Sequence, residues 1–274
     1  MPTSLTRLSP PDATRRPLSG LCLGHRLVER AEAGQPYIYS SFIMSLNGAI
    51  AVDDGQVNWT HPETLTDPRD LRLLCELMAQ ADCLITSGGY LRDLERGSLG
   101  NLLQLPQTPE FQDLLDYRTQ NHDSLFPTVL VVSRSLDFQI PASIAEHRQV
   151  LRVLAPANAP ERRAAELREQ GADVILGDET DWVGSETVVA HLKELGARTA
   201  YLFCGPRMNG ILMQSGQVNR LYLTWLHRLQ GGHPALTVGS FLPASQARSL
   251  KLVELHQAEA EGDLPGLWFG YFDA

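Results

Sequence analysis

Short apolar runs alternate with segments of helical periodicity through the middle of the chain. The clearest apolar run covers residues 128–133 and is typical of a buried strand. From there to Gly216, strand-like and helix-like segments follow one another, which predicts a parallel sheet with right-handed crossovers. The expected buried strands are 83–86, 128–133, 150–154, 173–176 and 199–203, and the expected helices are 142–147, 161–170, 185–195 and a short one before Gly216.

Other patterns occur on either side of this region. Residues 37–44 are rich in β-branched and aromatic side chains and predict a strand, and leucines at helical spacing predict a helix that starts near Pro68. Strands are expected at 220–227, 250–256 and 267–272 with no helix between them. The C-terminal part of the sheet should therefore be antiparallel.

The first residues differ in composition from the rest. Residues 1–19 are polar and rich in proline, which is typical of a loose arm, and residues 21–33 predict a short helix. We therefore expect an N-terminal arm and helix at 1–35 and one α/β domain at 36–274. Residues 92–127, which glycines and prolines interrupt, form the least regular stretch, with one inserted helix.

The composition is that of a soluble globular protein. The 274 residues carry a formal net charge of −9, and 43% of them are hydrophobic. This acidic balance argues against binding to nucleic acid or to a membrane surface. The apolar runs are shorter than the roughly 18 residues of a membrane span, and the four cysteines form no CxxC pair. We expect a cytoplasmic protein that acts on a small molecule and has no metal site.

Glycine turns follow several expected strands. The strand at 199–203 breaks at Cys204-Gly205-Pro206, and a helix follows. Such a turn can cradle a phosphate, because the first N–H groups of the helix and its dipole point at the anion; an ordinary strand-to-helix turn is the alternative. The turns at Gly88-Gly89 and Gly177 also follow strands, and parallel sheets bind ligands at the carboxyl ends of their strands. These turns are therefore expected to line one crevice, although no GxGxxG fingerprint is present.

Motifs in a fixed order resemble the riboflavin-biosynthesis pyrimidine reductases, the reductase domain with the dihydrofolate reductase-like fold. Ser45-Leu-Asn-Gly-Ala-Ile-Ala51 resembles the family signature S-[LM]-D-G-[KR]-I-A, and residues 81–89 resemble A-D-A-[IV]-L-[VI]-G-x-G. Val131-Val-Ser-Arg134 resembles a family strand that ends in Ser-Arg. Cys204-Gly-Pro-Arg-Met-Asn-Gly210 resembles E-G-G-P-x-L-N-G, and residues 218–232 resemble V-D-E-L-x-L…L-x-G-G.

The resemblance, which covers about residues 36–272, implies a fold and an activity. The fold would be a three-layer α/β/α arrangement with a mostly parallel central sheet and antiparallel C-terminal strands. The activity would be NADPH-dependent hydride transfer to a ribosylamino-pyrimidine phosphate in a homodimer. The apolar stretch Leu221 to Leu226 of an expected late strand independently favours a dimer. The deaminase half often fused to this domain would need a Pro-Cys-x-x-Cys zinc motif, which this chain lacks.

The resemblance also assigns residues to the two sides of a site. Ser133 and Arg134 would hold the adenosine 2′-phosphate that distinguishes NADPH from NADH. The residues implied on the substrate side are Ser45, Asn47, Trp59 and Thr60. The residues implied on the cofactor side are Thr86, Gly88, Gly89, Ser133, Arg134, Gly177, Cys204, Gly205, Pro206, Arg207 and Met208.

Departures from the family pattern leave the reaction open. Asn47 stands where the family has Asp, Phe203 and Cys204 replace Glu and the first Gly of the turn, and Tyr90 replaces Thr. The alternatives are a non-catalytic nucleotide-binding relative and a reductase of a pteridine or another imine. The proton donor is not identified; His61 is a candidate, although a lone loop histidine is more often simply exposed.

The resemblance implies one unusual peptide bond as well. In the dihydrofolate reductase-like fold the Gly-Gly bond of the glycine turn is typically cis. We therefore expect a cis bond between Cys204 and Gly205, since Gly205 has no Cβ to clash with Cys204. A trans bond would favour the non-catalytic alternative.

Overall fold

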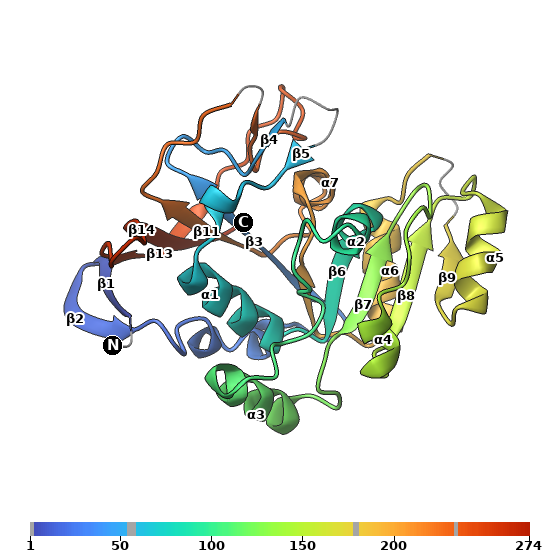
Figure 1. Cartoon of the computed structure of the whole chain (residues 1–274), viewed down its shortest axis with the longest axis horizontal. Helices are drawn as coiled ribbons and strands as arrows, with labels where there is room; N and C mark the ends of the chain where they lie inside the picture. Colours follow the sequence, from blue (N-terminus) through green and yellow to red (C-terminus); the bar gives the residue numbers. More distant parts are fainter. Residues whose placement is uncertain (1–2, 54–58, 178–180, 233–234) are drawn as a thin grey trace. The chain divides into compact units, whose positions relative to one another are not determined.

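The computed structural model describes residues 3–53, 59–177, 181–232 and 235–274. The chain forms two compact units, each assembled from segments that are distant in the sequence (Figure 1). The parallel unit, as we call it, contains residues 27–37 and 78–205. The mixed unit contains residues 1–26, 38–77 and 206–274.

A five-stranded parallel sheet forms the core of the parallel unit, with the strand order β10-β6-β7-β8-β9. Its strands are β6 (Cys83–Ser87), β7 (Thr128–Val132), β8 (Leu151–Ala155), β9 (Asp173–Leu176) and β10 (Thr199–Leu202). Leu84, Leu130 and Val153 are fully buried, as the continuous apolar runs of a parallel sheet require. The five strands expected from the sequence and their parallel direction are confirmed.

The helices expected from the sequence are α3 (Gln112–Asn121), α4 (Ala142–Glu146), α5 (Glu161–Glu169) and α6 (Ser185–Glu194). Helix α2 (Gly88–Glu95), which begins at the predicted glycine turn, was not expected, and the unit also contains the 3-10 turns η2 (Leu27–Arg30) and η4 (Pro109–Phe111). Helix α3, from the irregular stretch, lies near the amino-terminal ends of β6 and β7, whereas α2 begins at the carboxyl end of β6 (Figure 1). The two ends of the parallel sheet are therefore bordered by different segments.

The mixed unit contains a six-stranded sheet with the order β2-β1-β13-β14-β11-β3, in which β11 and β3 are parallel and the other pairs antiparallel. The antiparallel C-terminal strands are thus confirmed. The strands are β1 (Ser4–Ser9), β2 (Asp12–Pro17), β3 (Tyr37–Ser45), β11 (Arg220–Leu226), β13 (Lys251–Ala258) and β14 (Leu267–Asp273).

Shorter elements complete this unit. A three-stranded sheet has the order β12-β4-β5. Its strands are β4 (Ala51–Asp53), β5 (Trp59–Thr60) and β12 (Ala235–Leu236); the helical elements are η1 (Leu23–His25), η3 (Glu63–Leu65), α1 (Pro68–Ala79) and α7 (Pro206–Gln214). Among the described residues, no helix is both long and apolar enough to cross a bilayer.

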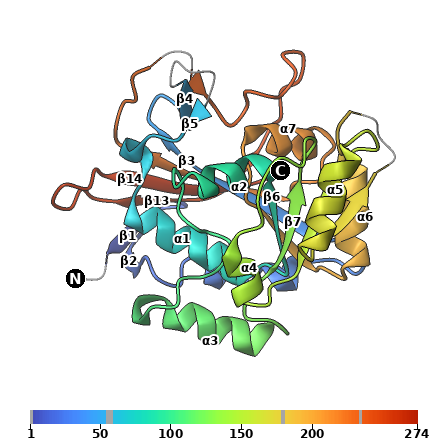
Figure 2. The ribbon, with the colours of Figure 1, turned by 45° about the vertical axis from the view of Figure 1, so that its right-hand side comes forward.

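The N-terminal segment is a β-hairpin, so the expected loose arm is wrong. Strand β1 pairs with β2 and β13 (Figure 1 and Figure 2). The side chain of Leu5 on β1 is fully buried. The expected helix at 21–33 is also wrong, because 3-10 turns replace it. The buried carboxylate of Glu76 on α1 accepts hydrogen bonds from the backbone N–H groups of Gly20 (2.6 Å) and Cys22 (2.8 Å). These N–H groups thus bind a side chain that lies far away in the sequence.

Candidate functional site

The predicted cofactor-side turns of the parallel unit lie at one edge of its sheet. Gly88 follows β6, Ser133 follows β7, Gly177 follows β9 and Gly205 lies just beyond β10. Because the strands are parallel, these turns share the carboxyl edge. The strand order reverses at β6, since β7 to β9 extend to one side of it and β10 lies on the other. Ligands of open α/β sheets bind outside the carboxyl ends of strands at such a reversal, which here lies between β6 and β10.

The turn after β6 is packed tightly against the end of β7. A Cβ atom placed on Gly88 would lie 2.6 Å from Ser133 Oγ and 3.1 Å from Phe138 Cδ1, so glycine is required for this approach. Ser133 Oγ accepts a hydrogen bond from the N–H of Leu136 (3.1 Å), which fixes the hydroxyl oxygen. Its own proton can still be donated to a ligand. The structure thus brings Gly88 and Ser133 together, as the resemblance implies.

Three further features of this edge fit a phosphorylated dinucleotide. Arg134 is exposed, and no hydrogen bond or ion pair joins it to another described residue, so its guanidinium is available to a phosphate. Gly205 is also exposed, and a Cβ atom at this position would have no neighbour within 4 Å. Thr86 Oγ1 is fully buried near the end of β6 and has no partner among the described residues. Arg134 and Thr86 thus provide hydrogen-bond donors for such a ligand, and Gly205 leaves space for it.

The Cys204–Gly205 bond is trans, so the expected cis bond is wrong. The cis bond found in the described residues is Ser9–Pro10. A non-proline cis bond costs about 2.5–4 kcal/mol and persists where surrounding packing enforces it. The open space around Gly205 provides no such packing.

Two departures from the family pattern contact each other beside this turn. The rings of Tyr90 and Phe203 pack edge to face, with centroids 5.2 Å apart. The Tyr90 hydroxyl donates to the carbonyl of Gly100 (2.9 Å) and accepts from the N–H of Leu102 (2.7 Å). Burial raises the pKa of Tyr90 to about 12, so its hydroxyl stays protonated. The Tyr90 hydroxyl therefore bonds to the backbone of the 92–127 segment, and the Tyr90 ring packs against Phe203.

The remaining predicted cofactor residues begin α7 in the mixed unit. Arg207 is exposed, and its guanidinium carbon lies 4.6 Å from the centre of the Phe241 ring. Pro206 is buried and Met208 is half-buried. A Cβ on Gly210 would lie 3.2 Å from the carbonyl oxygen of Phe241, so the 241 segment lies directly against α7.

The predicted substrate residues Ser45 and Asn47 form a hydrogen-bonded loop at the end of β3. Ser45 Oγ donates to Asn47 Oδ1 (2.8 Å) and accepts from the N–H of Ala49 (3.0 Å). The Asn47 amide also contacts the backbone of Gln230. Trp59 and Thr60 form β5, and their side chains lie outside the part of the structure that is described.

Sequence reasoning missed the carboxyl group of Asp70. It is half-buried on α1 and accepts a 2.5 Å hydrogen bond from Thr224 of β11. Burial raises the pKa of Asp70 to about 6, which is the range that a proton donor needs. Nδ1 of His61, the sequence candidate, donates to the carbonyl oxygen of Ile50 (3.0 Å). Asp70 carried no signal in the sequence, because its partner lies on a distant strand.

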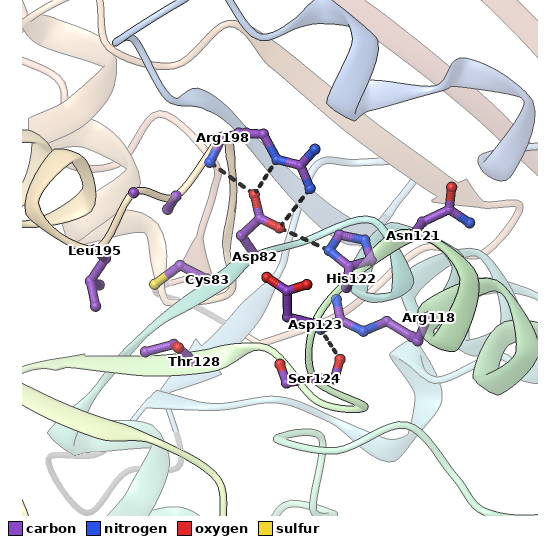
Figure 3. Close-up of a pocket in the computed structure, with 12 residues that line it drawn as sticks. Asp82, Cys83, Arg118, Asn121, His122, Asp123, Ser124, Thr128, Leu195 and Arg198 are labelled. Atoms are coloured by element: carbon purple, nitrogen blue, oxygen red, sulfur yellow. Dashed lines mark hydrogen bonds and ion pairs between the residues drawn. The ribbon is translucent and has the colours of Figure 1, made fainter.

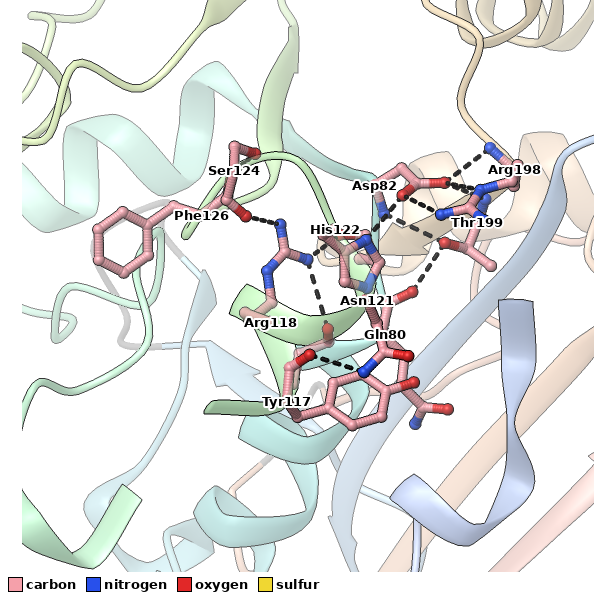
Figure 4. Close-up of polar contacts among 12 residues, drawn as sticks. Gln80, Asp82, Tyr117, Arg118, Asn121, His122, Ser124, Phe126, Arg198 and Thr199 are labelled. Carbon is pink, nitrogen blue, oxygen red and sulfur yellow. Dashed lines mark hydrogen bonds and ion pairs between the residues drawn. The ribbon is translucent and has the colours of Figure 1, made fainter. Parts of the chain in front are cut away.

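A polar pocket of about 380 Å³ lies at the opposite, amino-terminal edge of the parallel sheet (Figure 3). Its central group is Asp82, which accepts from the backbone N–H groups of Arg198 (2.8 Å) and Thr199 (3.2 Å) and from His122 Nδ1 (2.8 Å). Beside it, Arg118 donates to four backbone carbonyl groups. The carbonyl of Ser124 is one of them (Figure 4). These charged groups are bound within the protein, so the pocket contains a structural latch that joins α3, β6 and β10.

The chain matches one known protein family. The profile of the RibD C-terminal domain matches residues 36–262, which is most of the chain. No curated protein sequence matches it.

Solved structures provide a second comparison. The chain is similar to a pyrimidine reductase-like protein from Corynebacterium diphtheriae, with 20% identity over 87% of this chain and 91% of that chain and a TM-score of 0.66. It is also similar to RibD of Acinetobacter baumannii (15% identity, 88% and 59% coverage, TM-score 0.60) and to the riboflavin biosynthesis reductase Rib7 of Saccharomyces cerevisiae (14%, 92% and 98%, 0.54). The chain thus spans 59% of that RibD chain. These matches confirm the predicted α/β fold of the pyrimidine reductases.

Proposed function

Because the chain belongs to the RibD C-terminal domain family, we propose that it is an NADPH-dependent reductase of a ribosylamino-pyrimidine phosphate. The observation that carries this proposal is the carboxyl edge of the parallel sheet. There an exposed Arg134, unpaired among the described residues, follows Ser133, which is itself packed against the glycine turn at Gly88. When bound, the nicotinamide cofactor supplies the hydride.

The residues of the parallel unit would bind and orient the cofactor. Arg134 and the Ser133 hydroxyl hold the 2′-phosphate, because a guanidinium and an O–H both donate to phosphate oxygens. The turns at Gly88-Gly89 and at Cys204-Gly205 face the pyrophosphate with backbone N–H groups, and Thr86 and Gly177 complete the edge. The start of α7, with Pro206, Arg207 and Met208, extends the second turn.

The loops of the mixed unit would bind the substrate. Ser45, Asn47, Trp59 and Thr60 are the proposed contacts, and Asp70, whose pKa burial raises to about 6, is the proposed proton donor. We further propose a cytoplasmic homodimer.

The direct test is NADPH oxidation with 5-amino-6-(5-phosphoribosylamino)uracil as substrate, followed at 340 nm. We expect turnover with NADPH and a much lower kcat/KM with NADH. Binding of NADPH in calorimetry without turnover on this pyrimidine or on pteridine and imine substrates would establish the non-catalytic alternative. The trans Cys204–Gly205 bond and the Tyr90–Phe203 pair favour that alternative. Turnover only on a pteridine or imine would establish the third candidate.

A further inference from the structure

The side chain of Asn47 is exposed, yet its hydrogen-bonding groups are nearly all occupied. Its Oδ1 accepts from Ser45 Oγ (2.8 Å) and from the backbone N–H of Gln230 (3.0 Å). Its Nδ2 donates to the backbone carbonyl of Gln230 (3.0 Å). An amide has two N–H donors and one oxygen with two acceptor positions. One N–H of Asn47 therefore remains for a ligand.

The backbone of Gln230 determines which atom of the Asn47 amide is the oxygen and which is the nitrogen. A backbone N–H can only donate and a backbone carbonyl can only accept, so these two contacts identify the oxygen and the nitrogen of the Asn47 amide. Turning the amide over would place two donors together and two acceptors together. The orientation of Asn47 is thus determined by the main chain it contacts.

The Gln230 segment is itself held in place. Its side-chain Oε1 accepts from Thr64 Oγ1 (2.7 Å), and its Nε2 donates to the carbonyl of Gly231 (3.0 Å). Arg228 Nη1 donates to the carbonyl of Thr64 (3.1 Å). These contacts tie together three loops, around residues 47, 64 and 230, which we call the Asn47 clamp.

We infer that Asn47 determines the polarity of the ligand edge: it presents a single N–H donor, so the ligand atom facing it is an acceptor, a ring carbonyl oxygen. The inference rests on the proposed function, which places the substrate at this loop. An aspartate at the same position would present oxygen and would select a ligand N–H instead. It would also lose the bond to the Gln230 carbonyl, because a carboxylate cannot donate.

The test is whether Asn47→Asp reverses the ligand preference of the wild-type protein. The probes are ribosylaminopyrimidine 5′-phosphates that differ by an oxo or an amino group at ring position 2 or 4, measured by calorimetry with NADPH bound. Wild type should bind the oxo form at least about tenfold more tightly at one of these positions, because a site built for one polarity leaves groups unpaired with the other. Asn47→Asp should reverse that preference. The same preference in both proteins would overturn the inference, since a merely structural role predicts no reversal.

Hydrogen exchange tests the clamp without any ligand. At pH 8, Asn47→Asp should accelerate exchange of the Gln230 amide relative to wild type, because the second carboxylate oxygen faces the Gln230 carbonyl and this repulsion outweighs the acceptor that the carboxylate keeps for the Gln230 N–H. Protonation of the new carboxyl at pH 4 should reduce the difference by restoring a donor. The matched control is Asn121→Asp, because Asn121 is also exposed and its Nδ2 donates to the backbone carbonyl of Tyr117 (2.8 Å). An unchanged Gln230 exchange rate in Asn47→Asp would overturn the clamp. Absence of binding to every probe together with the expected exchange pattern would instead refute the proposed substrate.

Discussion

Arg134 is the residue on which the choice of cofactor depends. It is exposed at the end of β7, and no ion pair with another described residue competes for its guanidinium. Arg134→Ala should weaken NADPH binding by roughly 1.5–3 kcal/mol, the size of a hydrogen bond to a charged group. NADH binding should hardly change, because NADH lacks the 2′-phosphate.

Titration calorimetry with both cofactors measures this difference. Arg96→Ala is the matched control, since Arg96 is an exposed arginine of the same unit whose 3.7 Å partner is Asp93. If Arg134→Ala weakens the binding of NADPH and NADH equally, Arg134 does not bind the 2′-phosphate.

Asp70 should make the stability of the protein depend on pH. Its folded pKa of about 6 lies above the unfolded value of about 3.9, because burial disfavours the charged carboxylate. The group therefore contributes full stability below about pH 4, and this contribution is lost as the pH rises through 6. Asp70→Asn, which keeps an acceptor for Thr224, should be more stable than wild type at pH 8 by roughly 1–3 kcal/mol. At pH 4 the two proteins should be similar.

Urea denaturation of both proteins between pH 4 and pH 8 measures this pH dependence. Glu63→Gln on η3 is a control carboxyl at an exposed position. If the free energy of unfolding depends on pH in the same way for wild type and Asp70→Asn, Asp70 is already ionised at pH 4.

At the level of single residues, the sequence predicted positions better than contacts. Spacing placed Gly88 and Ser133 at strand ends, and the parallel sheet brought them together. The partners of Asn47 and Tyr90 could not be predicted, because Gln230 and Leu102 are backbone groups of irregular loops. Hydrogen bonds to loop backbone follow no periodicity, so the sequence gives no signal for them.

Among the elements, the Asp82 latch holds the amino-terminal ends of β6 and β10 and helix α3 in register. Burial alone would raise the pKa of Asp82, but hydrogen bonds from His122 and Arg198 outweigh burial and lower it well below its usual value. The carboxylate therefore stabilises the fold above about pH 4, and this contribution is lost as the pH falls further.

Asp82→Asn should reduce the free energy of unfolding at pH 7 by roughly 1.5–3 kcal/mol, since charged hydrogen bonds become neutral ones. Asp173→Asn is the control, because the Asp173 side chain, in a 3.1 Å ion pair with Arg152, is 55% exposed. Chemical denaturation at pH 7 and pH 3 compares the variants. A loss for Asp82→Asn that is as large at pH 3 as at pH 7 would contradict the electrostatic origin.

Element prediction succeeded where periodicity was strong and failed where a distant polar group intervened. The strands of the parallel unit follow apolar runs and were found within a residue or two. The segment near residue 22 was expected to be helical, yet Glu76 binds its N–H groups and leaves short 3-10 turns. The β1–β2 hairpin was missed because its partner, β13, lies about 250 residues away in the chain.

For the whole molecule, one face of the mixed sheet suggests how two copies would associate. Trp225 lies directly opposite Trp268, and Phe272 lies opposite both Leu221 and Leu252, so these side chains share a face. Trp268 is 37% exposed and Leu252 is 38% exposed. The other face carries Thr224, which bonds to Asp70 of α1. Exposed apolar patches of this kind mark interaction surfaces.

We therefore expect this face to form the interface of the proposed homodimer, with Trp268 near its centre. Trp268→Glu should raise the dimer dissociation constant by about 30-fold or more, because a central tryptophan typically contributes at least 2 kcal/mol to an interface. Sedimentation velocity from 0.1 to 50 μM measures the change, and Trp182→Glu is the matched control, since Trp182 is 64% exposed in the parallel unit. If the wild-type protein sediments as a monomer throughout this range, the homodimer is excluded. If it is a dimer that Trp268→Glu leaves intact, the interface lies on another surface.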